Sequence, residues 1–230
     1  MITRRVFLSA ASAAALSGCS SIGSRELPAV AAKPQPKAMP AHYGPVLDEG
    51  YQIPAVPAGV VPERFWRQRV SNPFPSEVPG TIIVDTSTFF LHLVENGGTA
   101  MRYGVGVGQQ GFSWGGEAVM QYKRKWPTWK APDDMVARNP ELEPYSVANG
   151  GMAPGLMNPL GARALYLFDN GEDTLYRIHG NPEANSIGQA VSSGCIRLLN
   201  QDIIDLYERV RHRAKVIVMQ SNPALSVGLT

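Results

Sequence analysis

Only two cysteines occur among the 230 residues, Cys195 and Cys19, and the second of these lies within an N-terminal leader. One cysteine beyond the leader cannot form an internal disulfide. Cys195 is therefore a buried inert thiol, an intermolecular bridge or a reactive nucleophile. A zinc site requires three or four ligands at set spacing, which one such cysteine and four scattered histidines do not offer. We expect no metal and no other cofactor.

Charge is also sparse in this sequence. Charged residues make up 17% of the chain, the formal net charge is +2, and Arg4 and Arg5 are the only charges before residue 25. Removal of such a leader would lower the net charge to zero. No basic excess then remains to attract a polyanion, so we expect no nucleic-acid partner. The apolar fraction of 44% is typical of a globular domain.

Residues 1–19 indicate an export signal, because two arginines precede an apolar run that is too short to span a bilayer as a mature helix. Residues 3–8 resemble a twin-arginine signal, and residues 16–19 resemble a lipobox, whose cysteine becomes lipidated. We therefore expect a periplasmic protein that is anchored in the membrane through a lipid on Cys19, with Ser20 favouring the outer membrane. An ordinary cleaved signal with an unmodified Cys19 is the alternative.

Proline content divides the rest of the chain. Residues 20–77 are proline-rich and are expected to form a linker and an N-terminal extension that wraps the domain without adding a second core. Residues 78–221 carry the regular patterns of a folded domain, and residues 222–230 form a tail. Within the domain, residues 108–163 have so little periodicity that they indicate a functional loop or lid.

Alternating and β-branched residues predict a mainly β fold, with a sandwich-like or barrel-like mixed sheet and one main α-helix. The helix begins near residue 200, where apolar side chains recur at helical spacing, and a second, short helix is expected at 133–138. We expect Lys123 to Lys125 to form a solvated strand face and His92 to lie at the surface. The strands are expected at 81–85, 89–93, 101–107, 121–125, 164–168, 174–179 and 216–219.

The chemistry is concentrated around His179 and Cys195, which lie sixteen residues apart. By period two, Leu175, Arg177 and His179 share one face of a strand. A histidine within hydrogen-bond reach can take the proton of a thiol, and the Arg197 cation favours the thiolate. The spacing alone leaves a structural thiol equally open.

Gly194 has no Cβ, so the backbone can turn sharply before Cys195. The successive N–H groups of Gly194 and Cys195 are then expected to stabilise an oxyanion.

Taken together, the motifs resemble the L,D-transpeptidase (YkuD-like) catalytic domain over residues 78–221. The residues that carry the resemblance are His179-Gly180, Gly188, Ser192 to Leu198, Asp202, Leu206-Tyr207, Gly155 to Gly161 and Trp126 to Trp129. Many members of the family have a histidine directly before the motif glycine, where this chain has Ser193. A serine can still support the oxyanion with one hydrogen bond, but it carries no positive charge.

The resemblance implies a peptidoglycan L,D-transpeptidase. Cys195 would attack a stem tetrapeptide, release D-alanine and form a thioester, and an amine of another stem peptide or of an outer-membrane protein or lipoprotein would resolve it. His179 would be the base, and the Gly180 carbonyl would orient its ring. Carbapenems would acylate the thiol. The candidate substrate contacts are Arg197, Ser192, Tyr122 and Trp129.

Two other functions are compatible with the same residues. An L,D-carboxypeptidase would resolve the thioester with water, and a non-catalytic wall-binding module would keep the fold without the reaction. The sequence does not separate these three, because the choice of acceptor depends on the shape of the groove.

Overall fold

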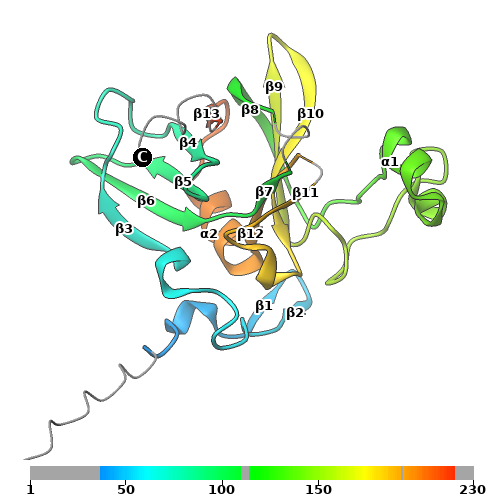
Figure 1. Ribbon diagram of the computed structural model, residues 1–230, viewed down its shortest axis with the longest axis horizontal. Helices are drawn as coiled ribbons and strands as arrows, with labels where there is room; N and C mark the ends of the chain where they lie inside the picture. The colour runs from blue at the N-terminus through cyan, green and yellow to red at the C-terminus, as the bar shows by residue number, and fades with distance from the viewer. Residues whose placement is uncertain (1–36, 110–113, 193, 221–230) are drawn as a thin grey trace, which may run out of the picture. The chain divides into compact units, whose positions relative to one another are not determined.

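The computed structural model describes residues 37–109, 114–192 and 194–220. Its main element is a nine-stranded sheet in the order β12-β10-β9-β8-β13-β4-β5-β6-β3 (Figure 1). Strands β10 and β12 pair in parallel, as do β13 and β4, and the other pairs are antiparallel. The mainly β fold with a mixed sheet is thus confirmed. The strands are β3 (Gln68–Ser71), β4 (Ile82–Asp85), β5 (Phe90–Val94), β6 (Thr99–Gly104), β8 (Gly116–Lys125), β9 (Arg163–Asp169), β10 (Glu172–Asn181), β12 (Ile196–Leu199) and β13 (Lys215–Met219).

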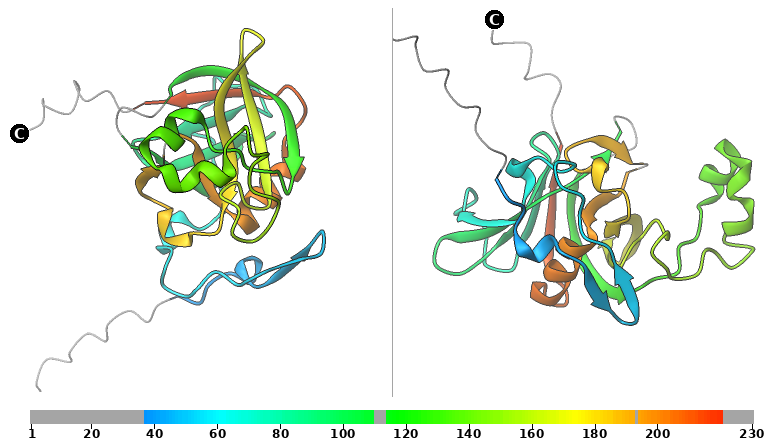
Figure 2. Two further views of the ribbon diagram at one scale, coloured as in Figure 1. Left: turned by 90° about the vertical axis from the view of Figure 1, so that its right-hand side faces the viewer. Right: turned by 90° about the horizontal axis from the view of Figure 1, so that it is seen from below.

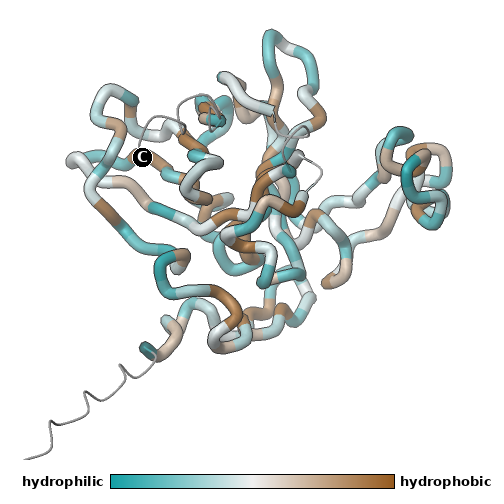
Figure 3. The backbone as a smooth tube through the Cα atoms, viewed as in Figure 1, coloured by the Kyte–Doolittle hydropathy of each residue, from teal (hydrophilic) through white to brown (hydrophobic). Residues whose placement is uncertain are grey.

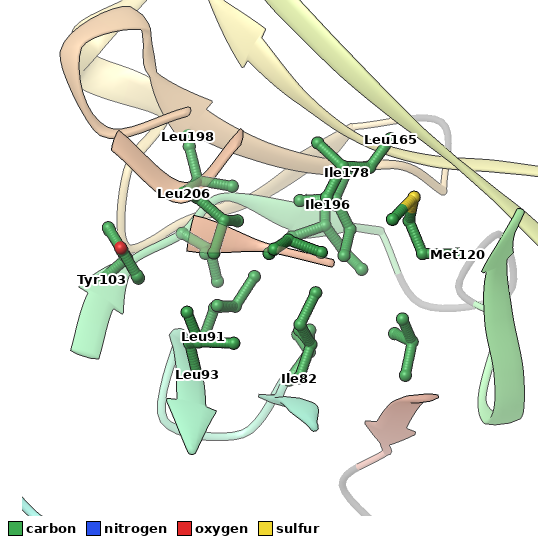
Figure 4. Packing of buried hydrophobic residues seen from close by; sticks show 14 of the residues in the cluster. Ile82, Leu91, Leu93, Tyr103, Met120, Leu165, Ile178, Ile196, Leu198 and Leu206 are labelled. Carbon is green, nitrogen blue, oxygen red and sulfur yellow. The ribbon is translucent and has the colours of Figure 1, made fainter. Parts of the chain in front are cut away.

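The two halves of the sheet enclose one hydrophobic core. Ile82 and Leu91 come from the β4–β6 half, and Met120, Leu165 and Ile178 come from the β8–β10 half; all five are fully buried in the same cluster (Figure 4). Burial of apolar side chains from both halves is the main force that holds such a sheet folded on itself. The barrel-like arrangement follows from this shared core.

One main α-helix, α2 (Asn200–Arg209), follows β12 directly and packs against β9 and β10. Ile203 and Leu206 are its fully buried apolar residues, as their helical spacing predicts. The predicted short helix is also present as α1 (Asp133–Arg138). Within the described residues, no helix is long and apolar enough to cross a membrane.

The N-terminal extension contributes more than the wrapping that the sequence predicts. Its strand β3 pairs with β6 and so belongs to the main sheet. A hairpin of β1 (Val46–Asp48) and β2 (Tyr51–Ile53) precedes it, with 3-10 turns at Ala41–Tyr43 and Glu63–Phe65. This segment also forms a hydrophobic cluster together with two domain residues, so it packs onto the domain as part of one compact unit. The members of this cluster are Tyr43, Val56, Val61, Phe65, Trp66, Ile187 and Leu199.

In the segment 108–163, the strand predicted at 121–125 is longer than expected, because β8 begins at Gly116. The irregular part that follows this strand is residues 126–162, which we call the excursion. The Trp126 N–H donates to the Ala162 carbonyl at 2.8 Å and closes its base. The excursion carries α1 and a 3-10 helix at Pro140–Tyr145, and both stand away from the β9–β10 hairpin (Figure 2). The tip of that hairpin is hydrophilic (Figure 3).

Two surface expectations are wrong. His92 is buried, packs edge-on against the ring of Phe74, and has its pKa lowered by burial to about 4. Lys123 does not face solvent with Arg124 and Lys125, because its Nζ donates to the carbonyls of Tyr207 and Val210. The ammonium group therefore satisfies the carbonyls at the C-terminus of α2, where the helix dipole favours a cation.

Replacement of Lys123 should lower the stability of the protein. We expect Lys123→Met to lower the free energy of unfolding by about 1–2 kcal/mol, because the last carbonyls of α2 lose a charged donor. Lys125→Met is the matched control on the same strand, because its pair with Glu49 is exposed to solvent and should contribute little to stability. Urea unfolding of both variants tests this, and equal losses would contradict the capping role.

Candidate active site

The parallel pairing of β10 with β12 brings the two reactive residues to one face of the sheet. His179 pairs with Arg197, and Ile178 pairs with Ile196. Both isoleucines are core residues, so His179 and Arg197 project from the opposite face. Continued by one residue, this register sets Cys195 opposite Arg177, which is also on the face of His179. The Cα atoms of Cys195 and His179 are then diagonal neighbours about 8 Å apart, within reach of an aromatic side chain.

His179 is buried, and its tautomer is set by the backbone. The Nδ1 atom lies 2.6 Å from the Gly180 carbonyl oxygen, which is the contact that the family resemblance implies. Because a carbonyl can only accept, Nδ1 carries the proton and Nε2 has the free lone pair. Burial is the largest influence on the ring and lowers its pKa to about 4, although the Gly180 carbonyl stabilises the protonated form. The imidazole is therefore neutral at neutral pH.

The loop before Cys195 is braced by the Ser192 side chain. The Ser192 hydroxyl donates to the Cys195 carbonyl at 2.6 Å and accepts from the Gly194 N–H at 3.2 Å. Ser192 is buried and is held by the loop itself, and its contact with substrate stays a prediction. The Gly194 N–H, which was expected to stabilise an oxyanion together with that of Cys195, donates to Ser192 in this structure, and its role at an oxyanion stays a prediction. Ser193 lies outside the described residues, as does Cys19.

Glycines let the chain pass close behind this loop. Gly194 has a φ of 125°, a conformation that side chains with a Cβ rarely adopt. A Cβ on Gly108 would lie 2.7 Å from the Gly194 Cα, and one on Gly106 would lie 2.5 Å from the Ser186 carbonyl oxygen. Glycines at alternate positions, such as 104, 106 and 108, can also occur in phosphate-binding loops. Here they allow close packing of the backbone. The short parallel pairing of β7 (Val107–Gly108) with β11 (Ala190–Ser192) is formed here.

The thiol is less acidic than the sequence suggests. Cys195 is half-buried as a residue, and burial of the thiol raises its pKa above the ordinary value. The Arg177 N–H and the charges of Arg177 and Arg197 lower the pKa, but by less than burial raises it. Arg197 thus lowers the Cys195 pKa, as expected, but the effect of burial is larger. Both reactive groups are consequently neutral at neutral pH, as a thiol and an imidazole.

A row of stacked side chains crosses the same face toward the thiol. Tyr122 pairs with Tyr166, and Tyr166 pairs with Arg177, on three neighbouring strands. The two tyrosine rings are 4.4 Å apart at 20°, and the Arg177 guanidinium lies 4.4 Å above the Tyr166 ring. Sequence reasoning missed Tyr166 and the role of Arg177. Period two places Arg177 on the His179 face, but nothing local in the sequence identifies Tyr166 as its neighbour.

Arg197 and Trp129, the remaining predicted substrate contacts, lie in different parts of the structure. Arg197 is half-buried, with its Nη1 atom 3.4 Å from the exposed carboxylate of Glu183. Trp129 lies in the excursion, where its backbone pairs with Met152 and its ring lies 6.4 Å from that of Tyr145. These contacts with substrate stay predictions. No group of three or more metal-ligating side chains occurs in the part of the chain that the structure describes.

Comparison with known proteins identifies the family. The model of the L,D-transpeptidase catalytic domain matches residues 79–218, which is more than half of the chain. A curated relative, the probable L,D-transpeptidase YbiS of Escherichia coli K12, is 32% identical over 142 residues, or 59% of this chain and 43% of the relative. The chain thus matches less than half the length of that protein.

Two solved structures are also similar. One is described as a probable carnitine operon oxidoreductase from Brucella melitensis; it is 41% identical, with a TM-score of 0.47, and the match covers 66% of this chain and 91% of that one. The other is an L,D-transpeptidase from Mycobacterium smegmatis, 17% identical with a TM-score of 0.44 over 60% and 58% of the two chains. The family model, which covers both His179 and Cys195, decides the assignment: the chain belongs to the L,D-transpeptidase catalytic domain family.

Proposed function

We propose that this protein is a peptidoglycan L,D-transpeptidase that works through a thioester on Cys195. The observation that carries the proposal is the β10–β12 register, which sets a histidine of fixed tautomer and a cysteine on one face of the sheet. The substrate class follows from the family, whose members act on stem peptides of the wall.

The first half-reaction begins from the neutral pair. His179 Nε2 takes the Cys195 proton while the sulfur attacks the carbonyl carbon of the bond between the third residue of the stem and its terminal D-alanine. The carbonyl oxygen becomes an oxyanion, and we assign the Cys195 N–H as a donor to it, a contribution that is typically worth about 10²–10³ in rate. When the C–N bond breaks, His179 returns the proton to the D-alanine amine, and D-alanine leaves.

The second half-reaction reverses these roles. An amine of another stem peptide, or of an outer-membrane protein or lipoprotein, attacks the thioester carbonyl and gives its proton to His179. The C–S bond breaks, and the proton passes to sulfur, so the enzyme returns to its starting state. No redox change and no cofactor are required. We assign Arg197 to a carboxylate of the substrate, which would replace Glu183 at the guanidinium group.

Three features suit Tyr122 and Trp129 to the donor stem peptide. The Tyr122 ring heads the stacked row that leads across the sheet to Arg177 and the thiol. The excursion that carries Trp129 starts at the end of the same strand, β8. Both side chains are half-buried, so each keeps an exposed surface that a peptide can contact.

A muropeptide assay tests the reaction class. The full chain is incubated with tetrapeptide muropeptides, and the products are read by mass; we expect cross-linked dimers together with free D-alanine. Cys195→Ala should lower product formation at least about a thousandfold while the protein stays folded. Trimmed monomers without dimers or protein adducts would instead identify a carboxypeptidase. Wild-type protein that binds wall fragments and yields no product would identify a binding module.

The neutral pair gives a particular pH dependence. His179 acts as a base only when unprotonated, and since its pKa is lowered to about 4, we expect kcat/KM to stay level down to about pH 5 and to fall near pH 4. Iodoacetamide reacts with the thiolate, and because the Cys195 pKa is raised, alkylation should be slower at pH 7 than for free cysteine and still rise with pH above 9. An acid limb near pH 6.5 would show that the His179 pKa is not lowered, and rapid alkylation at pH 7 would indicate a thiolate that already exists as an ion pair with the imidazolium.

We further propose that the protein is exported by a twin-arginine signal and held in a membrane, preferably the outer membrane, by a lipid on Cys19. This rests on the leader sequence, because residues 1–36 lie outside the described part of the chain. Cys19→Ser should move the protein from the membrane fraction to the soluble periplasmic fraction. A protein that stays with the membrane after this change is not held by that cysteine.

A further inference from the structure

The segment 41–66 precedes the matched family domain, which starts at residue 79, yet it contacts Arg163 next to the chain that packs on Gly180, and Gly188 in the loop that leads to Cys195. We propose that this segment is a positioning element: Asp48 holds the backbone that orients His179, and Phe65 holds the loop that carries Cys195. The inference rests on the proposed function for its activity measurements.

Asp48 joins the two ends of the excursion at the place where it leaves and rejoins the sheet, which we call the root of the excursion. The two Asp48 carboxylate oxygens accept from Arg163 at 2.7 and 2.8 Å, and one of them also accepts from the Trp126 indole at 2.8 Å. Tyr51 of the same hairpin stacks on Trp126 with ring centroids 3.9 Å apart. Arg163 is only 2% exposed. Trp126 and Arg163 are the residues where the excursion leaves and rejoins the sheet, so one carboxylate joins its two ends.

From this root the contacts continue to the histidine. Ala162, next to Arg163, donates its N–H to the Asn200 side chain at 2.9 Å. A Cβ on Gly161 would lie 2.6 Å from the Gly180 carbonyl carbon, so the returning chain rests on the backbone of Gly180. The Gly180 carbonyl in turn accepts from His179. Movement of the root would therefore shift the group that orients the imidazole.

The Phe65 end acts on the loop before the nucleophile. The Phe65 ring fills the space beside Gly188 so closely that a Cβ on that glycine would overlap the ring. Ile187 and Leu199 pack in the same cluster with Phe65. The Gly188 N–H also donates to the Val105 carbonyl at 2.9 Å, so the loop lies between the ring and the glycine-rich chain. Four residues later the loop reaches Ser192, whose hydroxyl holds the Cys195 carbonyl.

Buried polar contacts fix the middle of the segment. The Tyr43 hydroxyl donates to Asp202 at 3.1 Å and accepts from the Arg67 N–H at 2.6 Å. Arg67 also lies 3.3 Å from Asp205, so two acidic residues of α2 are engaged. Buried polar groups of this kind add little net stability but impose one geometry on the parts they join. The segment is thus held in register with the strand–loop–helix unit that carries Cys195.

Substitution of Asp48 and substitution of Phe65 should have different effects on the enzyme. Asp48→Asn keeps the shape and an acceptor for Trp126 but removes the charge that faces Arg163. We expect kcat to fall about tenfold with KM changed less than twofold, and the acid limb of kcat/KM to move up from about pH 4 toward the ordinary range for histidine. Asp48→Glu should recover part of the loss. Leu47→Ser, at an exposed position on the same strand, is the control and should change neither.

Phe65→Leu and Phe65→Ala should change the reactivity of the Cys195 thiol and leave the acid limb of kcat/KM where it is. With the ring reduced, the loop is less confined, and we expect alkylation of Cys195 by iodoacetamide at pH 7 to accelerate three- to tenfold while kcat falls about tenfold or more. Glu63→Gln, in the same turn and half-exposed, is the control. The Leu variant keeps the experiment informative if the Ala variant does not fold.

Thermal melting separates positioning from stability. The proposal is overturned if the variants melt at lower temperature but, below their melting point, keep the kcat, the acid limb and the alkylation rate of the unaltered protein within twofold. A failure of the proposed function has a different signature: the unaltered protein then forms no product from muropeptides, whereas the alkylation comparison still tests the Phe65 contact.

Discussion

The arrangement of the site depends on one pairing, that of β10 with β12 in parallel. The two strands are joined by fourteen residues, 182–195, which carry the chain back beside the C-terminal end of β10 so that β12 can run in the same direction. Because side chains alternate along each strand, the register that buries Ile178 and Ile196 obliges His179 and Arg197 to face outward together. A slip of one residue would bury the histidine in the core and expose the isoleucines. The hydrophobic core therefore enforces the geometry of the polar face.

Burial also decides the protonation of the pair. Two arginines lie near Cys195 and would favour a thiolate, but the loss of water around the sulfur outweighs them. The same loss of water keeps His179 neutral. A neutral thiol is a poor target for stray electrophiles and becomes nucleophilic when a base takes its proton during attack. A neutral pair would therefore limit side reactions of the thiol until its proton is removed.

Close backbone packing shapes one side of the loop that carries Cys195. Gly108 faces Gly194, and Gly106 faces the carbonyl of Ser186, so two segments of chain meet with no side chain between them. Phe65 closes the other side of the loop from a segment that precedes the family domain. The loop is therefore confined by the glycine-rich strand end, by the extension and by its own serine. This confinement explains why the Gly194 N–H is used internally.

The sequence alone determined the candidate reactive residues, the motifs of the family, most strands and the main helix, because each depends on residue identity or on local periodicity. His179 and its face followed from period two, and the Gly180 contact followed from the motif. Only the tertiary structure decided that Tyr166 and Arg177 lie in one row, that Lys123 caps α2, that His92 is buried, and that Asp48 and Phe65 reach the active-site loops. Each of these depends on which segments, distant along the chain, become neighbours, and on how much water packing removes. Neither quantity is encoded in any local stretch of residues.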